Sequence, residues 1–173
     1  MRVFAMDEAR FGLINWHKRR YGPKGIRPPW IVRRDYEWMW LYAALEPATG
    51  ESFCLYLPHL DGVCYELFLQ KLSQCYPDDI IILIRDNAPA HIKQDIKLAQ
   101  TILPLALPPY SPELNPVERW FLEFRRTLAN RSFDTITDFQ EALTAILKSY
   151  WQDPAALKQL SNFPWWHQAV NQL

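Results

Sequence analysis

A short apolar run at residues 80–84, Ile-Ile-Ile-Leu-Ile, constrains the fold more than any other stretch of the chain. A run with no polar face is typical of a central strand that is buried on both sides of a sheet. The run stops at Arg85 and Asp86, and Pro89 then suits the first turn of a helix. Because ligands of open α/β sheets bind beyond the carboxyl ends of the strands, this order makes Asp86 a candidate site residue. Asp86 could equally begin a turn or cap the helix.

The periodicity of the rest of the chain predicts an α/β domain with a mixed sheet. A turn at residues 47–50 joins two apolar strands, so three antiparallel strands should open the sheet and two parallel strands, reached through helices, should complete it. Residues 1–150 are expected to form this domain, and residues 151–173 a helical tail packed on it. Strands are expected at residues 2–8, 36–45, 51–57, 80–84 and 102–107, and helices at residues 61–76, 89–100, 116–130 and from 137 onward.

The spacing of apolar residues also predicts the ends and the buried faces of these helices. Asp61 should cap the first long helix, and Thr137 with Gln140 has the spacing of a capping box for the last one. The first helix is expected to bury Leu60, Cys64, Leu67, Phe68, Leu72 and Cys75, and the last to bury Phe139, Leu143, Ile146 and Tyr150.

The formal net charge is zero, with 19 Lys and Arg against 19 Asp and Glu, but the charges are unevenly spread. No acidic residue occurs between Ala9 and Arg34, so this mostly irregular segment is a candidate phosphate-binding patch. Trp16, Tyr21 and Trp30 are interleaved with the cations and could stack on bases, although a solvated loop with incidental charge is the alternative. The candidate DNA-binding residues are Arg10, Lys18, Arg19, Arg20, Lys24, Arg27, Arg33 and Arg34.

Three cysteines, Cys54, Cys64 and Cys75, form no closely spaced pair in the sequence. They indicate neither a disulfide framework nor a zinc site, and they suit a reducing compartment. The chain has no signal peptide and no run of about twenty apolar residues, so we expect a cytoplasmic protein with no membrane partner.

Three acids on different predicted elements could converge on one site. Alternation along the first strand puts Asp7 and Glu8 on opposite faces, so only one of them can enter a given site. Glu118 follows Asn115, a good N-cap, and could either join that site or reach back to cap the helix. Acids held together repel one another unless cations join them, and oxygen-only ligation suits Mg²⁺ or Mn²⁺.

Three blocks of the sequence resemble the signature blocks of DDE transposases, in the bacterial insertion-sequence branch of the mariner-like superfamily. The blocks are Met6-Asp-Glu-Ala-Arg-Phe11, Arg85-Asp-Asn-Ala-Pro-Ala-His91 and Leu107-Pro-Pro-Tyr-Ser-Pro-Glu-Leu-Asn-Pro-Val-Glu118. The resemblance implies a ribonuclease-H-like fold with a catalytic, metal-binding triad of acids. Asp7 would bridge two Mg²⁺ or Mn²⁺ ions, Asp86 would bind one ion and Glu118 the other.

The matched blocks also contain residues that would support the triad. Asn87 and His91 are expected to support the site, and His91 could be either a structural hydrogen-bonding residue or one that orients a phosphate. Glu8 is not a ligand in this family, in agreement with its place on the opposite face of the strand.

The same resemblance implies a function and partners. The chain would cut double-stranded DNA at transposon ends and join the freed 3′-hydroxyl to target DNA, as a homodimer assembled on DNA in the bacterial nucleoid. Family members carry helix-turn-helix modules before the first catalytic strand, whereas Asp7 stands six positions after Met1, so a separate helix-turn-helix subunit from an upstream reading frame is expected. The alternatives are a non-catalytic DNA-binding remnant and a host ribonuclease-H-like nuclease.

Overall fold

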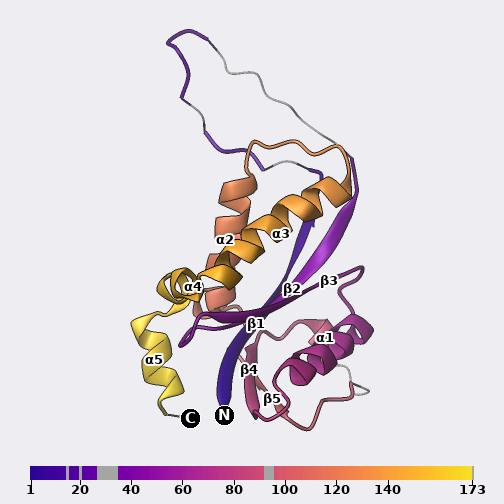
Figure 1. Ribbon diagram of the computed structural model, residues 1–173, viewed down its shortest axis with the longest axis vertical. Helices are drawn as coiled ribbons and strands as arrows, with labels where there is room; N and C mark the ends of the chain where they lie inside the picture. The colour runs from indigo at the N-terminus through magenta and orange to yellow at the C-terminus, as the bar shows by residue number, and fades with distance from the viewer. Residues whose placement is uncertain (15, 20, 27–34, 92–95, 173) are drawn as a thin grey trace.

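The computed structural model describes residues 1–14, 16–19, 21–26, 35–91 and 96–172. These residues fold around a five-stranded sheet in the order β3-β2-β1-β4-β5 (Figure 1). The strands are β1 (Arg2–Gly12), β2 (Trp38–Glu46), β3 (Glu51–Leu57), β4 (Ile81–Arg85) and β5 (Ile102–Ala106). β1 runs antiparallel to β2, and β2 to β3, whereas β4 is parallel to both β1 and β5. The predicted mixed sheet is therefore confirmed.

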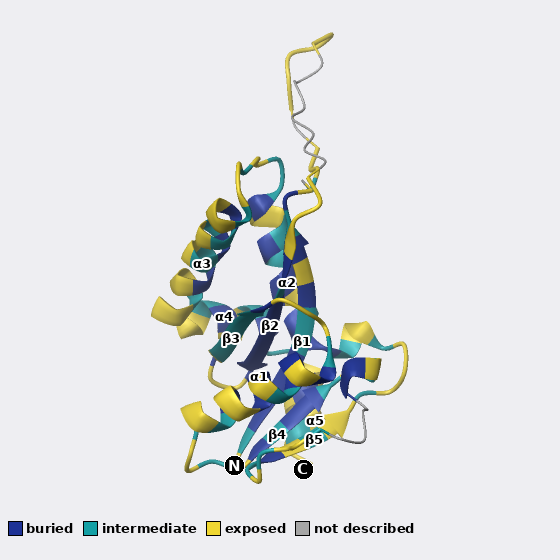
Figure 2. Cartoon of the chain, turned by 90° about the vertical axis from the view of Figure 1, so that its right-hand side faces the viewer, coloured by how far each residue is buried: buried dark blue, intermediate teal, exposed yellow. Residues whose placement is uncertain are grey.

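Helices cover both faces of the sheet (Figure 1). Figure 2 shows that buried residues line the sheet and the helix sides that face it, while residues 21–26 stand out from the body of the molecule. None of the described helices is long and apolar enough to cross a membrane. One face of the sheet carries α1 (Gly62–Cys75), and the other carries α2 (Pro116–Leu128), α3 (Ile136–Gln152), α4 (Pro154–Ser161) and α5 (Pro164–Val170), with short 3₁₀ turns at η1 (Pro89–His91) and η2 (Pro112–Leu114).

The side chains of β1 alternate between two apolar clusters, one on each face of the sheet. Val3 and Phe11 belong to the cluster that contains α2 and α3, whereas Phe4 belongs to the cluster beneath α1. Asp7 and Glu8 continue this alternation and point to opposite faces, as the period of a strand requires. β1 extends beyond its predicted end at Glu8 because it stays paired with β2 as far as Gly12.

The helix predicted over residues 89–100 is wrong for the described part of that segment. Only the short turn η1 forms, and residues 96–99 have no regular structure. Contacts with α1 explain the difference, because Ile96 and Ala99 pack against the cluster beneath α1, and the Lys97 backbone N–H donates to Glu66 Oε2 at 3.4 Å. Such tertiary contacts outweigh a local helical pattern, which is only a weak preference.

The buried face of α1 is shifted from the predicted one. Asp61 caps the helix as predicted, accepting a hydrogen bond from the Cys64 N–H at 2.9 Å. Successive residues lie about 100° apart around a helix, so a buried stripe centred on Phe68 turns Leu67 outward. Cys64, Phe68 and Leu72 are buried as predicted, whereas the prediction is wrong for Leu60, Leu67 and Cys75, which are exposed, and it missed Tyr65 and Leu69.

The start of α3 also differs from the prediction. Thr135 caps this helix, not Thr137, and its capping-box partner is Asp138 rather than Gln140. The sequence rule favours Glu or Gln at the third position, but the shorter Asp side chain makes the same pair of hydrogen bonds here. Phe139 and Leu143 are buried as predicted, whereas Ile146 and Tyr150 are only partly buried.

The segment predicted as a helical tail contains the two helices α4 and α5. Asp153 caps α4, and prolines stand at the first turns of both α4 and α5, where their missing N–H groups cost nothing. Leu157 of α4 and Trp166 of α5 join the apolar cluster that contains α2 and α3.

Candidate active site

The register of the sheet brings two of the predicted acids side by side. Ala5 of β1 pairs with Ile84 of β4, and Asp7 and Asp86 each lie two residues beyond that last parallel pair. Glu118 arrives from the first turn of α2. All three acids border one hollow of about 400 Å³, together with Asn87, Asn115 and the loop of residues 107–112. The fold thus brings together three acids that are far apart in the sequence.

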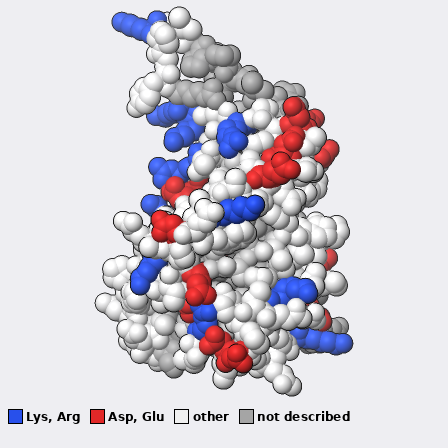
Figure 3. Space-filling view, viewed as in Figure 1, with Lys and Arg blue, Asp and Glu red and all other residues white. Residues whose placement is uncertain are grey.

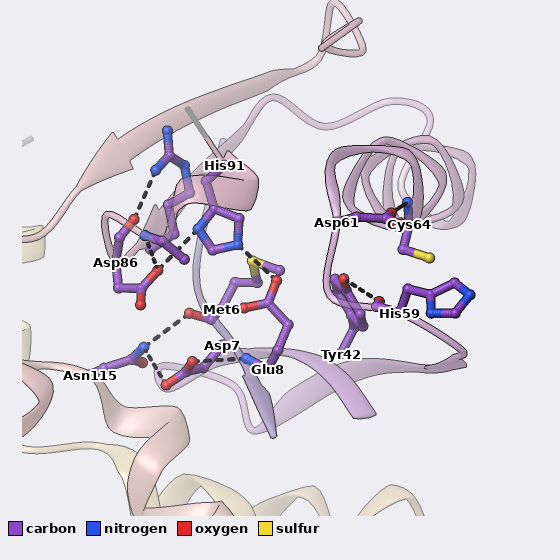
Figure 4. A network of polar contacts seen from close by, with 12 residues as sticks. Met6, Asp7, Glu8, Tyr42, His59, Asp61, Cys64, Asp86, His91 and Asn115 are labelled. Atoms are coloured by element: carbon purple, nitrogen blue, oxygen red, sulfur yellow. Dashed lines mark hydrogen bonds and ion pairs between the residues drawn. The ribbon is translucent and has the colours of Figure 1, made fainter. Parts of the chain in front are cut away.

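Asn115 connects Asp7 to the start of α2 (Figure 4). Its side-chain N–H₂ donates to Asp7 Oδ2 at 3.2 Å and to the Met6 carbonyl at 2.9 Å, and its Oδ1 accepts from the Val117 N–H at 3.1 Å. The last of these bonds confirms the predicted N-cap. The bonds to β1 were not predicted, because nothing local in the sequence pairs residues 108 positions apart.

Asp7 is a carboxylate in an unfavourable place for its negative charge. Burial raises its pKa to about 8, and the negative charge of Glu118, followed by those of Glu8 and Asp86, acts in the same direction. A hydrogen bond from the Glu8 N–H, at 2.8 Å, opposes the rise. A cation near Asp7 would therefore be stabilised by the fold, because it would offset charges that already repel one another.

Asp86 is held by an imidazole that sequence analysis singled out. Asp86 Oδ1 accepts from the Ala88 N–H at 3.0 Å and lies 3.0 Å from His91 Nδ1. The contact with His91 holds the pKa of Asp86 below its usual range. The other imidazole nitrogen, Nε2, lies 2.8 Å from Oε1 of Glu8, whose side chain is almost fully buried (Figure 4).

The protonation of His91 follows from these two carboxylates. Burial alone would lower its pKa, but the hydrogen bonds to Asp86 and Glu8 outweigh burial and raise the pKa to about 9. The two carboxylates therefore favour the protonated form of the imidazole. Glu8 belongs to this network, although the sequence predicted that it points away from the site. A buried carboxylate requires a hydrogen-bonding or charged partner, and this rule could have indicated such a contact for Glu8.

Glu118 has no side-chain hydrogen bond or ion pair among the described residues. The backbone N–H of Asn115, which a capping box would pair with Glu118, donates instead to the Pro112 carbonyl at 2.9 Å. Glu118 therefore does not cap α2, and Glu118 borders the hollow instead. Among the described residues, no three His, Cys, Asp or Glu side chains are close enough together to bind one metal ion as they stand. The three acids therefore border an open hollow and do not form a complete coordination site.

Asn87 and the loop before η2 form the opposite wall of the hollow. Asn87 Nδ2 donates to the Leu107 carbonyl at 2.7 Å and so ties the chain after β4 to the chain after β5. Tyr110 takes a positive φ of 59° and is fully exposed, a backbone conformation that is uncommon outside Gly and Asn. Ser111 Oγ donates to the Pro109 carbonyl at 3.3 Å rather than to a base, so serine chemistry has no support here.

The described part of the predicted basic patch lies outside the acid hollow. Arg10, Lys18, Arg19 and Lys24 are exposed and none of them borders the hollow. Lys18 is tied to the end of α2, because its backbone N–H and carbonyl both bond the side chain of Asn130, at 3.0 and 2.9 Å. In Figure 3 several Lys and Arg side chains gather in the upper half of the face shown, below the projecting loop. The other candidates, Arg20, Arg27, Arg33 and Arg34, lie outside the described residues.

Two further hollows continue from the acids along α2. Glu118 borders both the acid hollow and the next one, which Arg119, Leu122 and Arg125 also line. Arg125 in turn borders a third hollow together with Arg10 and Trp38. The guanidinium of Arg10 lies over the half-exposed Trp38 ring, 5.4 Å from its centre. The three hollows form a row along one side of α2.

Comparison with known proteins gives a family and a fold. The family model described as DDE superfamily endonuclease matches residues 2–140. The chain is 28% identical, over 134 residues, to the uncharacterized protein y4pE/y4sA of Sinorhizobium fredii, a match that covers 76% of this chain and 99% of that protein.

Three solved structures with similar folds are complexes of the Mos1 transposase. The paired-end complex with the left transposon end has a TM-score of 0.66 at 20% identity and covers 91% of this chain and 52% of the Mos1 chain. The pre-cleavage Mos1 transpososome has a TM-score of 0.67 at 18% identity, and the match covers 93% of this chain and 54% of the Mos1 chain. The paired-end complex with Mn has a TM-score of 0.65 at 21% identity, and the match covers 91% of this chain and 53% of the Mos1 chain. The chain spans about half the length of the Mos1 chains, and the likeness confirms the ribonuclease-H-like fold.

Proposed function

Because the chain belongs to the DDE superfamily endonucleases, a family of enzymes that carry out polynucleotidyl transfer, we propose that it is the catalytic domain of a transposase. It would cut DNA strands and join their 3′ ends to target DNA by in-line displacement at phosphorus. The observation that carries this proposal is the meeting of Asp7, Asp86 and Glu118 at one hollow. The same observation favours an enzyme over a non-catalytic remnant, which would have no need of three acids that repel one another.

The residues around the hollow fit divalent cations. Asp7, Asp86 and Glu118 offer only oxygen donors, which suit Mg²⁺ or Mn²⁺, and the raised pKa of Asp7 marks a position where positive charge is favoured. We propose that Asp7 would be shared by two ions, with Asp86 on one and Glu118 on the other. When bound, such ions would neutralise charge on phosphate oxygens and act as Lewis acids. Two of the Mos1 complexes are described as containing Mn and Mg.

The chain's own residues would hold and orient the reacting groups. Asn115 fixes Asp7 against the start of α2, and the Ala88 N–H with His91 fixes one oxygen of Asp86. Asn87 and the loop of residues 107–112 would form the wall against which a DNA strand lies. No residue needs to form a covalent intermediate, because both displacements use an oxygen of water or DNA as the nucleophile.

We further propose that the DNA strand leaves the acids along the row of hollows beside α2. Arg119, Arg125 and Arg10 border these hollows, and none of the three has an ion-pair partner among the described residues. Arg125 lies seven positions after Glu118, or about 10 Å along the helix axis, so Arg119 and Arg125 could meet successive phosphates on one side of α2. Lys18, Arg19 and Lys24, the other described cations of the basic patch, would extend this track beyond Arg10.

Salt dependence of DNA binding tests the track. Changing Arg119 and Arg125 together to Gln should lower the magnitude of the log–log salt slope by about two, because each lost phosphate contact removes roughly 0.9 from it. Arg126→Gln is the matched control on the same helix, since Arg126 is already paired with Glu123 at 2.8 Å, and it should change the slope little. Equal slopes in the double variant and the wild type would show that DNA does not follow α2.

A nicking assay tests the proposed function as a whole. We expect the wild-type chain to nick supercoiled plasmid DNA in Mg²⁺ or Mn²⁺, to leave 3′-hydroxyl ends, and to do neither in excess chelator. Failure to nick DNA with either ion would favour the non-catalytic remnant. Cleavage confined to the RNA strand of RNA–DNA hybrids would favour the host ribonuclease-H-like nuclease.

The wider biological setting stays a proposal. Residues 1–150 would form the catalytic domain with residues 151–173 packed on it, and the protein would act on transposon ends and target DNA in the cytoplasm of a bacterium, at the nucleoid. Assembly as a homodimer on DNA, and recognition of particular ends by a separate helix-turn-helix subunit, are predictions that binding studies with both ends can check.

A further inference from the structure

Glu8 occupies a place where a carboxylate is costly. Its side chain is 4% exposed, on the face of β1 that packs against α1, and it does not border the hollow of Asp7, Asp86 and Glu118. Burying a carboxylate and its partner seldom improves stability over a well-packed apolar side chain. A role in the site, rather than a contribution to stability, would account for this carboxylate.

The contacts of Glu8 lead from the α1 face to the hollow. Its Oε1 lies 2.8 Å from Nε2 of His91, whose side chain is completely buried, and the opposite imidazole nitrogen lies 3.0 Å from Asp86 Oδ1 (Figure 4). One imidazole therefore links a carboxylate outside the hollow to a carboxylate inside it. The link is short at both ends, so a change at Glu8 can reach Asp86 through a single ring.

Contacts on both the ring and the backbone of His91 fix the position of its imidazole. The Tyr65 ring of α1 packs on it with 4.4 Å between ring centres, and the His91 backbone N–H donates to the Ala88 carbonyl at 2.9 Å. At the other end, Asp86 Oδ1 accepts from the Ala88 N–H and lies 3.0 Å from the imidazole Nδ1, whereas Oδ2 has no hydrogen bond among the described residues. His91 thus determines which oxygen of Asp86 is engaged and which one remains for a ligand in the hollow.

We propose that Glu8 is a positioning residue that acts through His91 to orient Asp86 toward a divalent cation that would bind in the hollow. This inference rests on the proposed function, since it assigns Asp86 as a metal ligand. Groups that orient a ligand from outside the coordination sphere typically change metal affinity by 10–100-fold when they are removed. Glu8 would accordingly influence the metal site without touching the metal or the DNA.

Mn²⁺ affinity, measured by electron paramagnetic resonance of the free ion, separates this role from a structural one. Glu8→Leu should weaken Mn²⁺ binding about tenfold or more, whereas Glu8→Gln, which can still hydrogen-bond His91 Nε2, should weaken it by less than about threefold. Glu46→Leu is the matched control, because Glu46 is also a buried glutamate in the sheet, paired with Arg2 at 2.6 Å. It should lower the melting temperature and leave Mn²⁺ affinity unchanged.

A second measurement needs no metal. The ¹⁵N resonances of the His91 ring should shift in metal-free Glu8→Leu and remain near their wild-type positions in Glu8→Gln. Should Glu8→Leu fail to fold, Glu8→Asp gives the same test, because the shorter side chain withdraws the carboxylate from His91 and should weaken Mn²⁺ binding. A folded Glu8→Leu or Glu8→Asp that binds Mn²⁺ as the wild type does would overturn the positioning role alone. A wild-type protein that binds no Mn²⁺ would overturn the proposed function and this inference together.

Discussion

Replacing Asp7 with Asn should abolish metal-dependent DNA cleavage and, at pH 8 without metal, make the protein more stable than the wild type. The loss of cleavage should reach at least about 10³-fold if Asp7 holds the metal as proposed, because losing the metal would raise the activation barrier by several kcal/mol. The gain in stability has a separate cause, which is that burial and the neighbouring acids disfavour the charged form of Asp7. A single variant would thus lose the reaction and gain stability.

The pH dependence of that gain follows from the raised pKa. The pKa of Asp7 rises from 3.8 to about 8 on folding, so between these values the folded state binds more protons than the unfolded state, and stability falls as pH rises. Asn cannot ionise and avoids this loss. The difference in unfolding free energy between variant and wild type should therefore be small near pH 4 and grow to roughly 2–4 kcal/mol by pH 8.

Urea unfolding across pH 4–8, with and without Mg²⁺, measures both effects. Millimolar Mg²⁺ should stabilise the wild type by mass action and leave Asp7→Asn nearly unchanged. Asp61→Asn is the matched control, because Asp61 caps α1 and does not border the hollow, and Asn is an equally good cap. It should neither gain stability at pH 8 nor lose cleavage. A stability difference that does not change with pH would show that the fold does not disfavour the charge of Asp7.

The sequence predicted the elements whose causes are local. Most of the apolar run of residues 80–84 became strand β4 (Ile81–Arg85), although Ile80 lies outside the strand and is exposed. Alternation along β1 correctly assigned Asp7 and Glu8 to opposite faces. Asn115 as the cap of α2 also followed from its own position before Pro116. Each of these outcomes depends on a period or a capping rule that a few consecutive residues can specify.

The errors concern contacts between distant segments. The helix predicted at residues 89–100 gave way, where that segment is described, to contacts of Ile96 and Ala99 with the cluster beneath α1. The bond between Glu8 and His91 spans 83 positions, and the bond between Asn115 and Asp7 spans 108. No local pattern predicts such pairs. The acids and His91 could therefore be predicted from their sequence blocks, whereas the contacts of Glu8 with His91 and of Asn115 with Asp7 could not.

Glu118→Gln should remove cleavage and the stabilisation by Mg²⁺ while leaving the metal-free fold intact. Gln retains a helix-compatible side chain of the same length in the first turn of α2, and the cap bond from the Val117 N–H to Asn115 Oδ1 does not involve Glu118. The substitution removes one negative charge near Asp7, so metal-free stability should be equal to or above that of the wild type. Cleavage should fall by about 10³-fold or more if Glu118 holds an ion.

The ionisation of Asp7 gives this variant an independent test. The charge of Glu118 is the second largest cause of the raised pKa of Asp7, after burial, so Glu118→Gln should lower that pKa from about 8 toward its ordinary value. The carboxyl ¹³C shift of Asp7, followed during a pH titration of metal-free protein, measures it directly. Glu113→Gln is the control, because Glu113 lies in η2 five residues earlier, is exposed, and does not border the acid hollow. If Glu118→Gln cleaves DNA and responds to Mg²⁺ as Glu113→Gln does, Glu118 is not a metal ligand. An unchanged pKa of Asp7 would further show that the two carboxylates do not share the hollow.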